Sequence, residues 1–168
     1  MLDGISLFFW GWVIAAILVT LLFVVLVRGG RGRTHDGHDP FVIDGDTLVS
    51  DRVRIRLHGI DAPEMSQAGG AAARSHLISL IAGGAVRIEP LGTDKYGRMV
   101  ARVHASCGDL GQLMVRDGYA RAAYGADYAG EERAARRSRA GLWAGPGIPS
   151  PAAHRAQSAG YVKNRKAS

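Results

Sequence analysis

The chain has 168 residues, with 21 Lys and Arg against 15 Asp and Glu, which gives a formal charge of +6. This charge favours polyanionic partners such as nucleic acid or anionic lipid, but it does not determine a fold. The single cysteine, Cys107, excludes an internal disulfide and a metal cage made of cysteines alone.

Residues 5–27 contain no charged side chain. A helix of this length is about 34 Å long, which is enough to cross the hydrocarbon core of a bilayer. A cleaved signal peptide is the main alternative, but it would begin with basic residues and contain a shorter apolar region. Here Asp3 precedes the run, and Arg28, Arg31 and Arg33 follow it. We therefore predict an uncleaved single-pass transmembrane anchor in a bacterial-type inner membrane. The positive-inside rule places the following domain in the cytoplasm, with an extracytoplasmic domain as the alternative.

The remaining chain divides by composition into three parts. Residues 28–39 are predicted to be a short flexible juxtamembrane linker. A metal site formed by His35, Asp36, His38 and Asp39 is the alternative, but their spacing matches no closed zinc site. Residues 40–145 contain the alternating and periodic patterns of a folded domain. Residues 146–168 carry no acidic side chain and are predicted to be a basic, disordered tail.

Within the domain, residues 52–58 alternate strictly between polar and apolar side chains, which predicts a half-buried strand. Its core face would carry Val53, Ile55 and Leu57, and its other face Arg52, Arg54, Arg56 and His58. A helix is expected over 67–82 with Ser66 as its N-cap, and strands are expected over 85–90 and 99–104. A capping box of Asp109 and Gln112 is expected to open a second helix, and a last helix is expected over 130–140. Short strands with an inserted helix predict a small α+β barrel.

Two carboxylates, Asp46 and Asp61, are expected at a turn and at a strand end. Together with backbone carbonyls and water, they would suit Ca²⁺, which prefers oxygen ligands. An EF-hand is excluded, because a loop beginning at Asp44 would place Val49 and Ile55 where glycine and glutamate are needed. A plain hairpin turn is the alternative explanation for Asp44-Gly45-Asp46.

Arginines suit the charge that develops when water attacks a phosphodiester. Arg56 is the strand arginine nearest in sequence to Asp61, and Arg98 ends the polar loop after the second strand. A solvated strand face is the alternative for at least two of the three strand arginines. Glutamate is a weak base at neutral pH, but Glu64 could act as general base on a water that the cation also polarises. The alternative is that Glu64 is an ordinary surface residue in a turn.

Three blocks, IDGDT at 43–47, RLHGIDAPE at 56–64 and TDKYGR at 93–98, closely resemble the thermonuclease family in order and spacing. The stretches at 113–124 and 141–143 resemble its C-terminal helical part. The resemblance implies a five-stranded OB-fold β-barrel with three helices. It also implies Ca²⁺-dependent hydrolysis of DNA and RNA at the P–O5′ bond, which leaves 3′-phosphate ends.

By position, the resemblance assigns roles to individual residues. The implied metal ligands are Asp46, Asp61 and the backbone carbonyl of Ala62, the catalytic residues are Arg56, Glu64 and Arg98, and the substrate-binding residues are Lys95 and Tyr124. The expected partner is single-stranded or unpaired DNA or RNA, bound by a monomer with no protein partner.

The chain departs from the family pattern in three places. The segment before Asp44 is short, so the first barrel strand is either truncated or partly supplied by the linker. The loop after Glu64 is brief and glycine-rich. The family's second tyrosine is replaced by Ala126, and Tyr128 is a possible substitute. A non-catalytic OB module that binds nucleic acid or protein is the alternative function, but the intact metal and catalytic positions favour an enzyme. A lipid-binding module would leave the acidic cluster unexplained.

Overall fold

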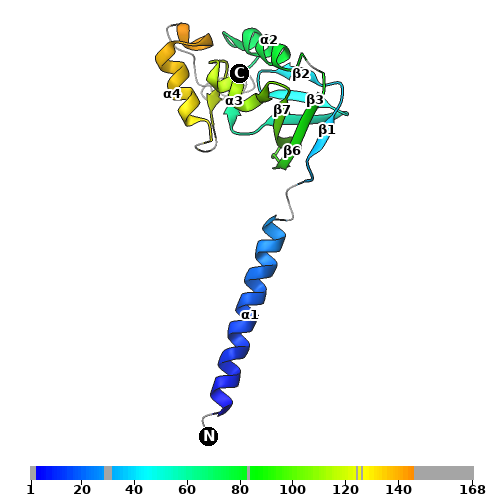
Figure 1. Ribbon diagram of the computed structural model, residues 1–168, viewed down its shortest axis with the longest axis vertical. Helices are drawn as coiled ribbons and strands as arrows, with labels where there is room; N and C mark the ends of the chain where they lie inside the picture. Colours follow the sequence, from blue (N-terminus) through cyan, green and yellow to red (C-terminus); the bar gives the residue numbers. More distant parts are fainter. Residues whose placement is uncertain (1–2, 29–31, 83, 124, 126, 146–168) are drawn as a thin grey trace, which may run out of the picture. The chain divides into compact units, whose positions relative to one another are not determined.

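The computed structural model describes residues 3–28, 32–82, 84–123, 125 and 127–145, and in the first helix it describes side chains at 10–22. Two compact units divide the chain, Met1–Gly32 and Arg33–Ser168. The first unit contains helix α1 (Asp3–Arg28) (Figure 1). Trp10 and Trp12 on this helix are exposed. No helix within the described residues is long and apolar enough to span a membrane.

A curled sheet forms the centre of the second unit (Figure 1). Its order is β1-β6-β7-β4-β3-β2, in which β4 and β7 are parallel and the other neighbours antiparallel. The strands are β1 (His35–Gly37), β2 (Phe41–Asp44), β3 (Thr47–Ser50), β4 (Val53–Leu57), β6 (Val86–Thr93) and β7 (Met99–Ala105), with β8 (Gly108–Asp109) beside β7. A separate ladder pairs β5 (Ile60–Asp61) with β9 (Arg121–Ala122).

Strands β1 and β2 lie at opposite ends of the sheet order, although only residues 38–40 separate them in the chain. One bent segment therefore reaches both edges of the sheet, and the sheet has the OB-like curvature of a partly closed barrel. Gly37 allows the close approach, because an added Cβ would lie 2.5 Å from both Ile88 Cδ1 and Ser50 Oγ. The fold thus begins before residue 40, and the predicted linker supplies part of the first strand, as one of the two alternatives anticipated.

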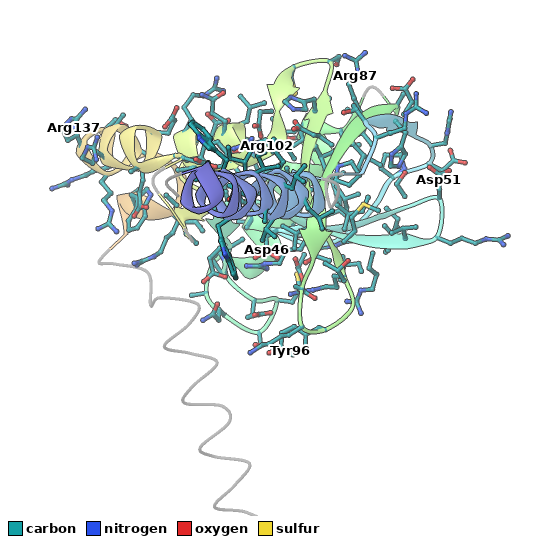
Figure 2. All side chains as sticks on the ribbon, turned by 90° about the horizontal axis from the view of Figure 1, so that it is seen from below. Asp46, Asp51, Arg87, Tyr96, Arg102 and Arg137 are labelled. Carbon is teal, nitrogen blue, oxygen red and sulfur yellow. The ribbon has the colours of Figure 1, made fainter. Side chains whose placement is uncertain are left out.

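Two of the helices described in this unit lie against the sheet (Figure 1). Apolar side chains from the helices and the strands together form the core. In the described part of the second unit, α2 (Gly70–Leu80) packs against β2, and α3 (Leu110–Arg116) packs against β7. Helix α4 (Ala129–Ser138) packs against α3 and β9, and the 3-10 turn η1 (Gly141–Ala144) follows it. The fully buried core includes Leu48, Ile55, Leu57, Leu77, Ile88, Val103 and Met114. Charged side chains such as Arg87 and Arg137 project from the rim of this unit (Figure 2). The mixed α+β class predicted for the domain is confirmed.

The structure corrects several local predictions. Helix α2 begins at Gly70 rather than residue 67, because its N-cap is Gly69 in a left-handed conformation (φ 90°) and not Ser66. Val53 is 41% exposed, since it directly follows the turn at the start of β4. Asp109 caps α3 as expected, but the Gln112 side chain donates to Glu131 instead of closing the capping box.

A pH-dependent ion pair joins α2 to the end of α3. The carboxylate of Asp117 contacts His76 Nε2 at 3.0 Å and accepts from Arg116 Nε at 2.8 Å. Burial opposes ionisation, but these two bonds outweigh it and lower the pKa of Asp117 below 3.8. A lowered carboxyl pKa adds stability that is present above about pH 4 and is lost as the pH falls through the folded-state pKa.

Asp117→Asn is therefore expected to lower the free energy of unfolding by up to about 1 kcal/mol at pH 7. The difference from wild type should shrink as the pH is lowered from 5 to 3 in urea unfolding experiments. A difference that grows on acidification would contradict this role for the carboxylate.

Candidate active site

An open cleft of about 790 Å³ lies over the outer faces of β4 and β7 in the second unit. Its walls come from the β2–β3 turn, the start of the loop after β5, and the loop between β6 and β7. The lining side chains are mostly charged and include Asp44, Asp46, Arg54, Arg56, His58, Glu64, Asp94, Lys95, Tyr96 and Arg98. Sequence segments that lie more than 30 residues apart thus meet at one site.

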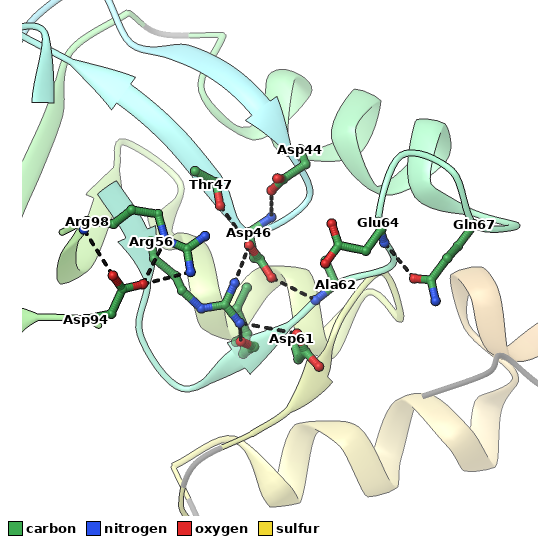
Figure 3. A network of polar contacts seen from close by, with 11 residues as sticks. Asp44, Asp46, Thr47, Arg56, Asp61, Ala62, Glu64, Gln67, Asp94 and Arg98 are labelled. Carbon is green, nitrogen blue, oxygen red and sulfur yellow. Dashed lines mark hydrogen bonds and ion pairs between the residues drawn. The ribbon is translucent and has the colours of Figure 1, made fainter. Parts of the chain in front are cut away.

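Arg56 occupies the centre of this site between two buried carboxylates (Figure 3). Its Nη1 lies 2.6 Å from Asp46 Oδ1, and its Nη2 lies 3.2 Å from Asp61 Oδ1. Nη2 also donates to the carbonyl of Ile60 at 3.1 Å. The Arg56 side chain is only 11% exposed, so the guanidinium is fixed in orientation by three acceptors.

The β2–β3 turn positions Asp46 through a set of short hydrogen bonds. Oδ1 of Asp46 accepts from Thr47 Oγ1 at 2.9 Å, and Oδ2 accepts from the backbone N–H of Ala62 at 3.2 Å. Asp44 Oδ1 accepts from the Asp46 N–H at 3.0 Å and so closes the turn. Burial, with the nearby charge of Asp46 as a second cause, raises the pKa of Asp44. Asp44 thus stabilises the turn through its side-chain oxygen, as the hairpin pattern predicts.

The oxygen atoms around Arg56 fit a hard divalent cation. Asp46 and Asp61 bring two carboxylates to the same guanidinium, and neither sulfur nor imidazole is part of this pair. Among the described residues, no group of three or more His, Cys, Asp or Glu side chains is placed to hold a metal. A bound cation would therefore need backbone carbonyls and water to complete its coordination, which Ca²⁺ tolerates well.

The loop between β6 and β7 holds the second predicted arginine. Arg98 donates to Asp94 Oδ2 from Nε at 2.8 Å, and its Nη2 lies 2.7 Å from the same oxygen (Figure 3). The other oxygen of Asp94 accepts from the backbone N–H groups of Tyr96 and Arg98. Desolvation opposes ionisation, but these bonds outweigh it and lower the pKa of Asp94. One carboxylate therefore fixes both the loop and its arginine.

Gln67 holds the backbone of Glu64, and the side chain of Glu64 lines the cleft. The Glu64 N–H donates to Gln67 Oε1 at 2.6 Å, and the Gln67 N–H donates back to the Glu64 carbonyl at 2.8 Å (Figure 3). Gly70 packs beneath this loop, because an added Cβ would overlap the Glu64 carbonyl oxygen and lie 2.9 Å from Met65 Cα.

Gly70→Ala is therefore expected to push the Glu64 loop toward the cleft and to lower kcat/KM about 10- to 100-fold. The matched control is Gly130→Ala in α4, where no heavy atom lies within 4 Å of the added Cβ. Initial rates of phosphodiester cleavage, the activity that the family resemblance implies, would measure both variants. Equal activity of the two would contradict the proposed packing of Gly70 against the loop.

The other predicted site residues have mixed outcomes. Lys95 lines the cleft, and its Nζ lies 5.0 Å from the Tyr96 ring centroid. Ala62 contributes a hydrogen bond through its N–H, and a metal-ligand role for its carbonyl stays a prediction. Tyr124 lies outside the described residues, so its role also stays a prediction.

Tyr128 does not replace the missing family tyrosine. It is 6% exposed and its hydroxyl donates to Asp109 Oδ2 at 2.9 Å. Burial, and secondly the charge of Asp109, raise the pKa of Tyr128 to about 12. The ring packs close to Gly59, so Tyr128 is a core residue that joins the cap of α3 to the start of α4.

The sequence assigned no role to Asp94 or Gln67, but the structure places Asp94 in the cleft wall and Gln67 against the backbone of Glu64. The signal for Asp94 was the polar turn Asp94–Gly97, in which an Asp side chain often accepts from backbone N–H groups two residues on. Gln67 carried no comparable signal, because its partner is the backbone of Glu64.

The model of the family described as staphylococcal nuclease homologue matches residues 54–145, which is more than half of the chain. The chain belongs to the staphylococcal nuclease family. The match includes Arg56, Asp61, Glu64 and Arg98, whereas Asp46 lies just before it.

Several relatives of this staphylococcal nuclease family member carry nuclease names. A micrococcal nuclease of Shigella flexneri is 36% identical over 129 residues, which are 66% of this chain and 74% of that protein. An uncharacterized endonuclease of Escherichia coli O157:H7 is 45% identical over 84 residues, which are 47% of this chain and 55% of that protein. A probable staphylococcal-like nuclease of Oryza sativa subsp. japonica is 34% identical over 103 residues, 59% of this chain and 28% of that protein. The chain thus belongs to a family of phosphodiester-hydrolysing enzymes, and it spans only about half the length of the E. coli relative.

Proposed function

We propose that this chain is a Ca²⁺-dependent nuclease that hydrolyses DNA and RNA to products with 3′-phosphate ends. The observation that carries the proposal is the guanidinium of Arg56, which pairs with the buried carboxylates of Asp46 and Asp61. Asp46 and Arg56 line the cleft together with Glu64 and Arg98, whereas Asp61 lies behind Arg56 and is not among the lining residues. A non-catalytic OB module needs an exposed basic surface, but it does not need two buried carboxylates on one guanidinium.

Asp46, Asp61 and the Ala62 carbonyl would hold the cation, as the family resemblance implies. When bound, the cation supplies positive charge to the phosphate and polarises a water molecule. The protein contributes the remaining chemistry through groups that are already oriented.

In the proposed reaction, Glu64 accepts a proton from the water that attacks phosphorus. Arg56 and Arg98 donate hydrogen bonds to the phosphoryl oxygens, whose negative charge increases in the transition state. The P–O5′ bond breaks, the departing O5′ takes up a proton to become a hydroxyl, and the phosphate stays on the 3′ side. Lys95 and Tyr124 would hold the substrate, the first from the β6–β7 loop.

The test is to incubate the full chain, in detergent, with denatured DNA or RNA and Ca²⁺. We expect both to be cut, and we expect DNA products that a polymerase extends only after phosphatase treatment. Products that are extended directly would contradict the proposed bond specificity, and absence of cleavage would favour the non-catalytic OB module.

We further propose that residues 5–27 tether the nuclease to the membrane, with the domain on the cytoplasmic side. The support is the uncharged run within α1 and the arginines at 28, 31 and 33 that follow it. Carbonate extraction of membranes would release the chain if the tether is wrong. Digestion of the domain by protease in intact spheroplasts would place it on the outer side instead.

A further inference from the structure

The basic side chains that line the cleft differ in whether they already have partners. Arg56 is paired with Asp46 and Asp61, and Arg98 is paired with Asp94. Lys95 lies over the ring of Tyr96. Arg54 also lines the cleft and is exposed, yet it makes no hydrogen bond, ion pair or ring contact with any residue that the structure describes.

The position of Arg54 is set by strand β4. Ile55 is 1% exposed, so its neighbours Arg54 and Arg56 both face outward, on the cleft side. Two residues along a strand cover about 6.6 Å. This separation is comparable with the interval between successive phosphates of an extended single strand. If Arg56 contacts the phosphate that is cleaved, Arg54 is placed to contact the next phosphate along the strand.

Charge also favours this role. The carboxylates beside Arg56 and Arg98 offset the charge of those arginines, whereas Arg54 adds an unpaired positive charge to the cleft. A guanidinium without a carboxylate partner binds a phosphate without first breaking an ion pair, and its forked donors match phosphate oxygens.

We propose that Arg54 binds the phosphate adjacent to the scissile phosphodiester and so forms a second phosphate subsite. The inference rests on the proposed nuclease function and deepens it. It makes the preferred substrate an oligonucleotide with at least one phosphate beyond the bond that is cut.

The test compares two substrates, thymidylyl-thymidine with one phosphodiester and a thymidine hexamer with five. The measured quantity is the ratio of kcat/KM for the hexamer to kcat/KM for the dinucleotide. In Arg54→Gln we expect this ratio to fall about tenfold. The slope of log kcat/KM for the hexamer against log salt concentration should become shallower by about 0.7.

Arg52→Gln is the matched control, because Arg52 is an exposed arginine beside the same strand that is not among the cleft-lining residues. It loses the same charge, and its ratio should stay within about twofold of wild type. Thermal unfolding of both variants would verify that they are folded.

Two results would overturn the subsite while leaving the nuclease function intact. One is a wild-type ratio in Arg54→Gln, and the other is an equal fall in Arg52→Gln and Arg54→Gln, which would indicate a general effect of charge. Failure of the wild-type chain to cut either substrate with Ca²⁺ present would instead contradict the proposed function itself.

Discussion

Replacing Glu64 with glutamine is expected to lower kcat on denatured DNA about 10²- to 10⁴-fold and to leave KM nearly unchanged. Glutamine keeps the shape and the backbone bonds that join residue 64 to Gln67, but it cannot accept a proton from water. Initial rates over a range of substrate concentrations would separate the two kinetic constants.

The control for this variant is Glu89→Gln, because Glu89 lies on β6 and is not among the residues that line the cleft. We expect Glu89→Gln to keep wild-type kcat. A loss of less than about threefold in Glu64→Gln would contradict general-base catalysis by this residue.

The second large effect is expected from Arg98→Lys, which should lower kcat about 10²- to 10³-fold. Lysine keeps the positive charge, but it cannot bind Asp94 and a phosphoryl oxygen through separate, coplanar N–H groups. In the structure the Nε and Nη2 atoms of Arg98 are both committed to Asp94 Oδ2, so the orientation of the remaining donors depends on this pairing.

Arg102→Lys provides the matched control, on the strand that directly follows Arg98. Arg102 on β7 also forms a close ion pair, with Asp127 Oδ2 at 2.6 Å, but it is not among the residues that line the cleft. Its kcat should stay within about threefold of wild type. Equal losses in both variants would show that replacing a paired arginine by lysine in this region disturbs the fold rather than the chemistry.

Local patterns in the sequence predict the centre of the site well. Strict alternation places Ile55 and Leu57 in the core and Arg56 on the opposite face, and the structure confirms this arrangement. Alternation fails for Val53, because burial at a strand end depends on what covers it and not on the period.

Contacts between distant segments were harder to predict. The start of α2 depends on how Gly69 and Gly70 pack against Leu142 and the Glu64 loop, and such contacts exist only in the folded chain. Motif similarity placed Arg98 at the site, but its pairing with Asp94 depends on the geometry of a loop. The bend that lets β1 and β2 reach opposite edges of the sheet is likewise a property of the closed fold.

The most direct test of the central claim is the rate of DNA cleavage as a function of Ca²⁺ concentration, in the wild-type chain and in Asp46→Asn. Asp46 is 5% exposed and contributes one of the two carboxylates next to Arg56. The account predicts that cleavage saturates with Ca²⁺ and stops with a chelator. It also predicts that Asp46→Asn needs at least about tenfold more Ca²⁺ for half-maximal rate, because removing one ligand charge weakens the site. Cleavage that persists in chelator, or the same Ca²⁺ dependence in both proteins, would contradict it.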